Sequence, residues 1–345
     1  MYIGFFNYYE IYNKNRMFTD ASSLIGDDLL YPFVYLGQYL IKKGHKINTI
    51  DMDNIENFDA IVFVDFPTLK NKYFKQLINN KFKNLYLLIY ECEAIKPNNW
   101  NIKNHKYFKK IFTWNDKFVD NKKYFKINFS SKIPTDLNFD LNKKDKLCTM
   151  IAANKFKFHP LELYTERVKA IRWFEENHPE DFDLYGIGWD RYYFKGMLSK
   201  LNRFDALTKL LKPKHPSYKG RIKFKKEVLQ KYKFAICYEN ARDIPGYITE
   251  KIFDCFFAGC IPVYWGAPNV TEHIPKDTFI DRRNFKTYDE LYKYLKNMSN
   301  KEYLNYLEAI KNFIKSDKIY PFSAEYFVGT IIKEIVDEKS KTNIW

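Results

Sequence analysis

Short apolar runs alternate with segments of helical periodicity along the first part of the chain. The runs are short enough to be buried strands. The segment 27–44 carries apolar residues at helical spacing and ends at Gly44, despite Pro32 near its start. This alternation predicts a doubly wound α/β domain with a parallel sheet. The expected strands of this domain lie at 1–9, 45–53, 59–67, 84–93 and 109–116.

A second alternation follows the polar stretch 135–146, which we interpret as a linker. We therefore expect an α/β protein with a Rossmann-like domain at 1–145, a second at 146–320, and a C-terminal helix at 321–345 that is able to pack back on the first domain. In the second domain, the expected strands lie at 146–154, 181–189, 233–240 and 260–265. The expected helices lie at 161–179, 224–232, 250–259, 287–298, 301–314 and 323–338.

A predicted helix is followed directly by a predicted strand in the stretch 246–269, GYITEKIFDCFFAGCIPVYWGAPN. A strand, a loop, a helix and a strand follow one another around it, which is the order of a crossover in a parallel sheet. In such sheets, ligands bind beyond the carboxyl ends of the strands. We therefore expect a ligand-facing rim at Asn240, Tyr247, Glu250 and Lys251.

Composition limits the class of protein. A chain of 345 residues with 46% hydrophobic residues suits two domains of about 150 residues. The formal charge of +15 comes mostly from scattered lysines. Scattered charge is typical of a solvated surface, and the alternative is attraction to a polyanion or to an anionic membrane.

Cysteine use and hydropathy bear on the compartment. The five cysteines are odd in number and form no CxxC pair, which is typical of buried thiols in a reducing compartment. No apolar run approaches a membrane span, and the amino terminus lacks a basic region ahead of an apolar one. We expect a soluble or membrane-peripheral protein, cytoplasmic and able to sit at the inner face of the membrane.

Two short motifs are ambiguous. Asp51-Met52-Asp53 is a DxD pattern of the kind that holds a metal ion in some sugar-nucleotide enzymes, but acidic residues at a strand end are more often solvated loop residues. Gly186-Ile187-Gly188 follows a predicted strand without the third glycine of a dinucleotide fingerprint. It either lets the backbone approach a ligand or forms a plain turn.

The run at 232–280 carries a family resemblance. It contains Glu239-Asn240, a GYITEK core and the strand PVYWG, and it resembles the donor-binding signature of the α-1,3-fucosyltransferases, glycosyltransferase family 10. Two weaker similarities lie outside it. IAANKFKFHPLELYTERVKAI points to Asn154 and Arg167, and IYECEAIKPNNWN points to Glu93.

The resemblance implies two facing Rossmann-like domains of the GT-B type, GDP-fucose as donor, and inversion at the anomeric carbon. No metal is obligatory in the family, and a divalent ion is expected at most to stimulate. The first domain would bind the acceptor and the second the GDP-sugar. The donor-binding residues that the resemblance implies are Asn154, Arg167, Asn240, Tyr247, Thr249, Glu250 and Lys251.

Physical chemistry leads to similar roles. Cleaving a sugar–pyrophosphate bond builds negative charge on the departing nucleotide, which a metal-free site must meet with fixed cations and helix amides. Lys251 and Arg167 are the candidates, whereas an ion pair is the structural alternative for each. Direct displacement also needs a base for the acceptor hydroxyl. We expect that base to be Glu93, with Glu91 as its rival.

Three functional hypotheses follow. The first is an inverting enzyme that transfers L-fucose to a hydroxyl of a glycan, with O3 of GlcNAc or glucose expected, in surface polysaccharide or lipopolysaccharide synthesis or protein glycosylation. The second is the same fold with another GDP-sugar. The third is a basic nucleic-acid-binding protein, which the core spacing of the aromatic residues disfavours. The acceptor and the choice between α-1,3 and α-1,4 linkage are left open by the sequence.

Overall fold

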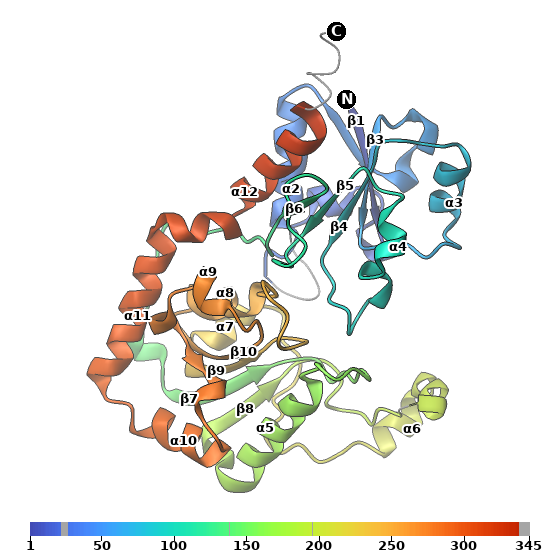
Figure 1. The fold of residues 1–345 in the computed structure, drawn as a ribbon. Coiled ribbons are helices and arrows are strands. Elements are labelled where there is room, and N and C mark those ends of the chain that lie inside the picture. The colour runs from blue at the N-terminus through green and yellow to red at the C-terminus, as the bar shows by residue number, and fades with distance from the viewer. Residues whose placement is uncertain (22–26, 138, 195, 338–345) are drawn as a thin grey trace. The chain divides into compact units, whose positions relative to one another are not determined.

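The computed structural model describes residues 1–21, 27–137, 139–194 and 196–337, which form two α/β units (Figure 1). The first unit contains Met1–Ile133, Ile244–Glu250 and the chain from Ser316 onward. The second contains Pro134–Asp243 and Lys251–Lys315. The polar stretch 135–146 therefore groups with the second unit, and the division falls just before it.

The first unit is built on a six-stranded sheet in which every strand pair is parallel, with the order β2-β1-β3-β4-β5-β6. Its inner strands are buried on both faces, as expected of a parallel sheet covered by helices. The five strands predicted from the apolar runs are confirmed, and β6 is an additional short edge strand. The strands are β1 (Tyr2–Asn7), β2 (Lys46–Thr49), β3 (Ala60–Val64), β4 (Leu85–Ile89), β5 (Lys110–Thr113) and β6 (Tyr124–Lys126).

Helices from both ends of the chain cover one face of this sheet. Helix α2 starts at Tyr31 with Pro32 in its first turn, where a missing N–H costs nothing. The ring of Phe33 in α2 lies 5.2 Å from that of Phe327 in α12, and both join the cluster over the sheet. The described part of the predicted C-terminal helix thus packs within the first unit, and residues 338–345 of that prediction lie outside the described residues. The helices of this unit are α1 (Arg16–Thr19), α2 (Tyr31–Lys42), α3 (Lys72–Asn79), α4 (Ile102–His105) and α12 (Ala324–Ile331).

A buried ion pair fixes the end of the described chain to the sheet. Residues 332–336 continue from α12 as a π-helical turn. Within this turn, the carboxylate of Glu334 lies 2.8 Å from Nζ of Lys110 in β5. The same ammonium group also donates to the backbone carbonyl of Glu334 at 3.2 Å. Since both side chains are largely removed from water, loss of either would leave a buried charge without this partner.

The second unit has a five-stranded parallel sheet with the order β11-β10-β9-β7-β8. Its central strand β9 pairs with β7 and β10, so the four apolar runs predicted as strands are confirmed and adjoin one another. The short strand β11 was not predicted. The strands are β7 (Lys146–Ile151), β8 (Phe182–Tyr185), β9 (Tyr232–Tyr238), β10 (Ile261–Trp265) and β11 (Ile280–Asp281).

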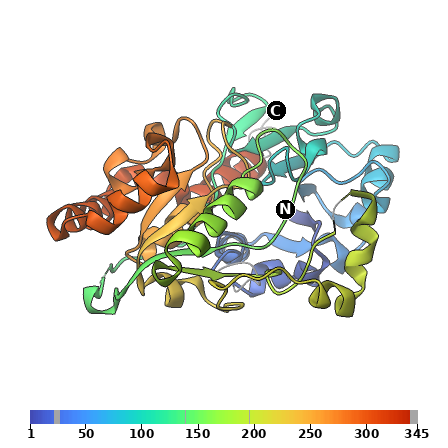
Figure 2. The same ribbon diagram turned by 90° about the horizontal axis from the view of Figure 1, so that it is seen from below.

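Helix α5 covers one face of this sheet in both ribbon views (Figures 1 and 2). The ring of Phe174 in α5 stacks on that of Phe182 in β8 at 4.7 Å. Five of the six helices predicted after residue 146 are confirmed in this unit, with ends that differ by up to three residues. The sixth, predicted at 323–338, is α12 of the first unit with its π-helical continuation, and its last residue lies outside the described residues. The helices of this unit are α5 (Tyr164–Asn177), α6 (Asp205–Leu210), α7 (Lys225–Leu229), α8 (Glu250–Phe257), α9 (Val270–His273), α10 (Tyr288–Asn297) and α11 (Asn300–Lys315), of which α8 starts at the last residue of the 244–250 segment.

Helix α8 ends where the sequence signal placed its end. Gly259 has φ +63°, the left-handed conformation that closes many helices. A methyl carbon at this position would lie 2.6 Å from the ring of Phe139. Both the backbone and the packing therefore require glycine here. None of the described helices is long and apolar enough to cross a membrane.

Candidate active site

The predicted base region follows strand β4 at the carboxyl edge of the first sheet. Glu91 lies two residues beyond the strand and is half-buried, whereas Glu93 is exposed. The backbone carbonyl of Glu91 accepts hydrogen bonds from Nδ2 of Asn99 and Nε1 of Trp100, both at 3.1 Å. The backbone that carries Glu91 is therefore fixed by the loop that follows it.

Asp65, at the carboxyl end of the neighbouring strand β3, holds the same turn from the other side. Its side chain is buried, and Oδ1 accepts hydrogen bonds from the N–H groups of Tyr90 and Glu91 at 2.9 and 3.0 Å and from Nδ2 of Asn99 at 2.7 Å. Asp65 has φ +62°, a left-handed conformation that aspartate tolerates better than most residues. Three donors on one buried oxygen make Asp65 the organiser of the loop before Glu93.

The charges around this loop are coupled. Burial raises the pKa of the Asp65 carboxyl, and Lys96 and the hydrogen bonds oppose that rise. Burial also lowers the pKa of Lys96, while Asp65 and Glu91 favour its charged form. Burial, followed by the charge of Glu91, raises the pKa of Tyr9 to about 12. A phenol, an ammonium group and two carboxyls are thus near enough to influence one another.

The segment 244–250 packs into the first unit. Gly246 has φ +78°, and a methyl carbon there would lie 2.3 Å from the carbonyl oxygen of Trp114. Tyr247 is 1% exposed, with its ring 4.6 Å from that of Trp114 and 6.0 Å from that of Phe129. Thr249 is also buried. Tyr247, which we expected beside the nucleotide, is therefore an aromatic core residue of the first unit in this structure.

Lys251 in α8 pairs with an acidic residue at the end of β9. Its Nζ lies 3.3 Å from Oε2 of Glu239. The Glu239 side chain is fully buried, whereas the Lys251 side chain is 24% exposed. The pair therefore holds the lysine by its buried side and leaves part of it open to solvent or a ligand.

Gly266 makes room for this pair. A methyl carbon on Gly266 would lie 2.5 Å from Cγ of Glu239 and 2.5 Å from the hydroxyl of Tyr264, closer than nonbonded carbon atoms approach. The backbone N–H of Glu239 donates to the carbonyl of Trp265 at 2.9 Å. The glycine of PVYWG therefore serves to admit the Glu239 side chain.

Arg167 is buried beneath the same strand end. Its Nη2 donates to the carbonyls of Tyr238 and Glu239 at 2.7 and 2.8 Å and to Oδ1 of Asn240 at 3.0 Å. Its guanidinium also lies over the ring of Tyr164 at 4.9 Å. These bonds fix the turn after β9, so the arginine orients Asn240.

Asn154 and the Gly186–Gly188 turn form one local arrangement at the ends of β7 and β8. Nδ2 of Asn154 donates to the carbonyl of Gly188 at 3.1 Å, and the backbone N–H of Asn154 donates to the carbonyl of Ile187 at 2.8 Å. Gly186 has φ +132°, and a methyl carbon there would lie 2.0 Å from the carbonyl oxygen of Ala152. Close approach of two protein segments explains the glycine without a ligand.

The DxD motif has local partners. Oδ2 of Asp51 accepts from the N–H of Lys14 at 2.8 Å, and Oδ1 of Asp53 accepts from Asn54 and Asn57, both at 2.7 Å. Within the described ranges, no group of three or more His, Cys, Asp or Glu side chains is placed to hold a metal ion. The aspartates thus serve as loop-forming residues.

The structure unites three of the predicted donor-binding residues, Arg167, Asn240 and Lys251, around Glu239. Asn154 lies beyond the neighbouring strand β7, and Tyr247 and Thr249 belong to the first unit. Sequence reasoning did not assign a role to Glu239 or Asp65. Both share one signal, an acidic residue directly after a buried apolar run.

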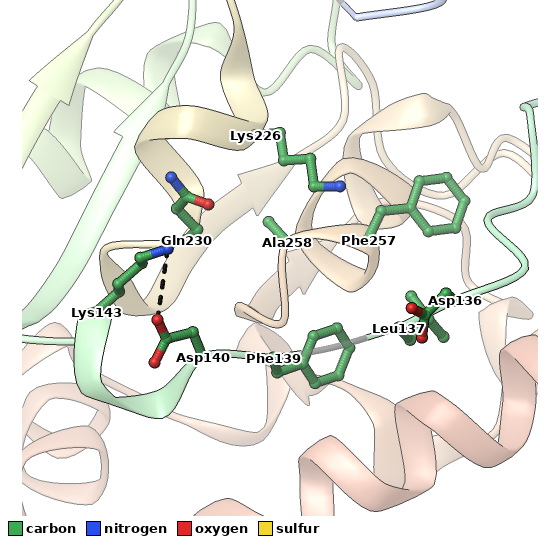
Figure 3. A pocket seen from close by; sticks show the side chains of 9 residues that line it. All are labelled: Asp136, Leu137, Phe139, Asp140, Lys143, Lys226, Gln230, Phe257 and Ala258. Atoms are coloured by element: carbon green, nitrogen blue, oxygen red, sulfur yellow. Dashed lines mark ion pairs between the residues drawn. The ribbon is translucent and has the colours of Figure 1, made fainter.

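A pocket of about 220 Å³ lies near the amino ends of strands β9 and β10 in the second sheet (Figure 3). Its wall includes Gln230, which precedes β9, and Ala258, which precedes β10. Lys143 and Asp140 form an ion pair of 3.4 Å at its rim. It contains none of the predicted site residues and is smaller than most ligand sites. We therefore place the candidate site at the carboxyl ends of the strands.

Part of the chain is similar in sequence to known proteins. Residues 190–330 match the family model described as glycosyltransferase family 10 (fucosyltransferase) C-term. The chain is 43% identical over 75 residues to the alpha-(1,3)-fucosyltransferase FucT of Helicobacter pylori, covering 22% of this chain and 16% of that enzyme. It is 41% identical over 85 residues to the mouse 4-galactosyl-N-acetylglucosaminide 3-alpha-L-fucosyltransferase 9, covering 24% and 23%. The matches thus span less than a quarter of either curated relative.

Solved structures extend the similarity to the whole fold. A crystal structure of an alpha1,3-fucosyltransferase aligns over 98% of this chain and 90% of its own, with a TM-score of 0.55 at 16% identity. The Anabaena protein Alr3699/HepE in complex with UDP-glucose aligns over 99% and 100%, with a TM-score of 0.56 at 9% identity. The predicted GT-B class, with two Rossmann-like α/β units, is confirmed.

Proposed function

Because residues 190–330 match the family model described as glycosyltransferase family 10 (fucosyltransferase) C-term, we propose that this protein is an inverting transferase that moves L-fucose from GDP-fucose to a glycan hydroxyl. The observation that carries the proposal is the cluster at the end of β9, where Glu239, Asn240 and Lys251 meet within the matched region. Such a cluster stands where parallel α/β sheets bind nucleotides.

Lys251 is the proposed contact for the pyrophosphate. Charge that grows on the leaving nucleotide is best stabilised by a cation already fixed in place. Glu239 provides this fixation because it pairs with Lys251 at 3.3 Å from a fully buried position. Glu250, the first residue of α8, is the proposed ligand for hydroxyl groups of the ribose or the fucose.

Arg167 and Asn240 act together in this proposal. Arg167 donates from Nη2 to two backbone carbonyls and to the Asn240 side chain. We assign the guanidinium chiefly to orienting the turn, and the Asn240 amide to a phosphate or ribose oxygen. Asn154, at the end of β7, is a further proposed donor contact.

The base is proposed to be one of the two glutamates after β4. The sequence favoured Glu93, but that residue is exposed, whereas Glu91 is half-buried beside the network of Asp65 and Lys96. A half-buried carboxylate on a fixed backbone is better suited to accept a proton in a defined direction than an exposed one. These surroundings favour Glu91, with Glu93 as the rival.

The acceptor is proposed to be a glycan of a surface polysaccharide or lipopolysaccharide, with transfer to O3 of GlcNAc or glucose. The name of the mouse relative specifies a 3-alpha-L-fucosyltransferase that acts on an N-acetylglucosaminide. The first unit is proposed to bind this acceptor and the second to bind GDP-fucose. Divalent metal is at most a stimulant in this scheme.

A panel of nucleotide sugars tests the donor. The purified protein is titrated with GDP-fucose, GDP-mannose and UDP-glucose, with and without chelator, and release of nucleotide is followed with and without N-acetyllactosamine. Selective use of GDP-fucose that survives chelation supports the proposal. Preference for another GDP-sugar would overturn the fucosyl assignment, and preference for UDP-glucose would overturn the donor class.

A matched pair of variants tests the base. Glu91→Gln should lower kcat by about 10²–10⁴-fold with little change in GDP affinity, because the amide cannot take a proton. Glu93→Gln, two residues away and more exposed, is the control and should keep most of its activity. The reverse pattern would assign the base to Glu93, and full activity in both variants would refute both assignments.

A further inference from the structure

Residues 196–214 form an extension of the second unit that we call the basic arm. It contains a 3₁₀ helix at Gly196–Arg203 and helix α6 at Asp205–Leu210. In both ribbon views, α6 lies away from the strands β7 to β10 and from the body of α5 (Figures 1 and 2). The arm falls between β8 and β9, and its residues take no part in either strand.

Side-chain and backbone hydrogen bonds give the arm a defined shape. The amide of Asn202 accepts from the N–H of Phe194 at 2.8 Å and donates to its carbonyl at 2.9 Å. The N–H of Tyr192 donates to the carbonyl of Thr208 at 2.7 Å. These bonds tie the two short helices to the segment 192–194 that precedes them. The exposed side chains of the arm are therefore presented on a built scaffold.

The arm exposes large apolar side chains. Met197 is 97% exposed and Leu210 is 82% exposed, and neither contributes to the core of the unit. Leu198, Phe204 and Leu211 are about half-exposed. Single exposed apolar residues are common, but five within fifteen residues of one arm suggest a surface that is covered in use.

The same arm is strongly basic. Its basic residues are five, its only acidic residue is Asp205, and the formal charge is therefore 5 − 1 = +4. Asp205 is itself matched by Arg191 at 3.0 Å and Lys209 at 2.6 Å. The five basic residues are Lys200, Arg203, Lys209, Lys212 and Lys214.

We propose that the basic arm docks on an anionic lipid surface, with Met197 and Leu210 entering the headgroup region and the lysines contacting lipid phosphates. Lysine is depleted at protein–protein interfaces, whereas lysines beside leucine, methionine and phenylalanine are typical of segments that lie in a membrane interface. The chain charge of +15 adds attraction of the same sign. Membrane docking in this form is independent of the sugar donor.

Vesicle binding of the full chain tests the proposal. Partition is measured by sedimentation with vesicles of phosphatidylcholine alone and of equal parts phosphatidylcholine and phosphatidylglycerol. Wild-type protein should bind the mixed vesicles, and its partition coefficient should fall as the salt concentration rises. Met197→Ser with Leu210→Ser should lower the partition coefficient by about tenfold or more, because each loses a buried apolar side chain. Lys200→Glu with Lys212→Glu should lower it by at least about 25-fold, since each lysine contributes about fivefold.

The control is a pair of exposed apolar residues of the first unit. Ile41 is 65% exposed and Leu69 is 56% exposed, so Ile41→Ser with Leu69→Ser removes two exposed apolar side chains that lie outside the arm. This variant should bind vesicles as the wild type does. Failure of the wild type to bind mixed vesicles at low salt, or an equal loss in arm and control variants, would overturn the proposal. Concentration-dependent dimerisation abolished only by the arm variants, without vesicle binding, would assign the surface to a second copy instead.

Discussion

Replacement of Lys251 separates a structural role from a catalytic one. In Lys251→Ala, Glu239 is left fully buried without its ammonium partner, which lay at 3.3 Å. Removing one member of a buried pair costs about 3–5 kcal/mol of unfolding free energy. Since the lysine side chain is 24% exposed and partly screened by solvent, we expect about 3 kcal/mol. Loss of activity in this variant alone would therefore not prove contact with the nucleotide.

A second substitution removes the structural part of the effect. In Lys251→Ala with Glu239→Gln, neither charge of this pair remains, so the unfolding free energy should return to within about 1 kcal/mol of the wild type. GDP affinity should stay about 10–150-fold weaker, because a charge-assisted hydrogen bond of about 1.5–3 kcal/mol to phosphate is still absent. Urea unfolding followed by tryptophan fluorescence measures the unfolding free energy, and calorimetric titration with GDP measures the GDP affinity.

The matched control is the pair Lys225 and Asp254, 2.5 Å apart in the same unit and also largely buried. Lys225→Ala should destabilise the protein to a similar degree and leave GDP affinity unchanged once the sample is folded. If the double variant at Lys251 and Glu239 binds GDP as tightly as the wild type, the lysine is a structural partner only. The pyrophosphate role would then be refuted.

Three further tests probe other parts of the structure by urea unfolding. Asp65→Ala should cost about 2–6 kcal/mol because it removes the acceptor of two part-buried backbone N–H groups and of the buried Asn99 amide, whereas Asp65→Asn keeps an acceptor and should cost clearly less; equal losses would contradict the hydrogen-bond assignment. Lys110→Met should cost about 3–5 kcal/mol, largely recovered by adding Glu334→Gln; no recovery would argue against the ion pair. Burial, with Arg172 nearby, lowers the pKa of His215 from 6.5, so the unfolded state takes up the proton more readily and the free energy of unfolding decreases as pH falls below about 6.5. His215→Gln should make the free energy of unfolding depend less on pH in this range, and an unchanged slope would show that His215 does not cause the dependence.

The strands and the motif helix were predictable because each depends on a local pattern. A buried parallel strand is a short apolar run whatever its neighbours are. Helix α8 is followed by Gly259, which has the left-handed φ that glycine adopts more readily than other residues. The basic arm was not predicted, because its short helices carry little periodicity and its hydrogen bonds join residues such as Tyr192 and Thr208 that no local rule pairs. Strand β6 was missed for a similar reason, since only half-buried positions mark it.

The candidate site was harder to predict than the fold because function there depends on buried partners. Lys251 was found from its motif, but its pairing with Glu239 depends on how α8 and β9 meet in space. Arg167 was expected at the pyrophosphate, whereas its Nη2 donates to backbone carbonyls of the β9 turn. A single sequence shows that a cation is present near a helix start but does not show which acceptors it contacts.

Most of the residues explained in the motif at 246–269 are therefore required by packing of the fold, and they do not indicate which sugar donor is bound. Gly246 admits a carbonyl, Tyr247 fills the aromatic core of the first unit, and Gly266 admits the Glu239 side chain. A protein with the same packing needs and a different sugar donor would keep all three. Glu250 and Lys251 are the residues of this stretch that we assign to the donor, and a phosphate contact does not distinguish fucose from mannose. Direct comparison of GDP-fucose with GDP-mannose is consequently the measurement on which the fucosyl assignment depends.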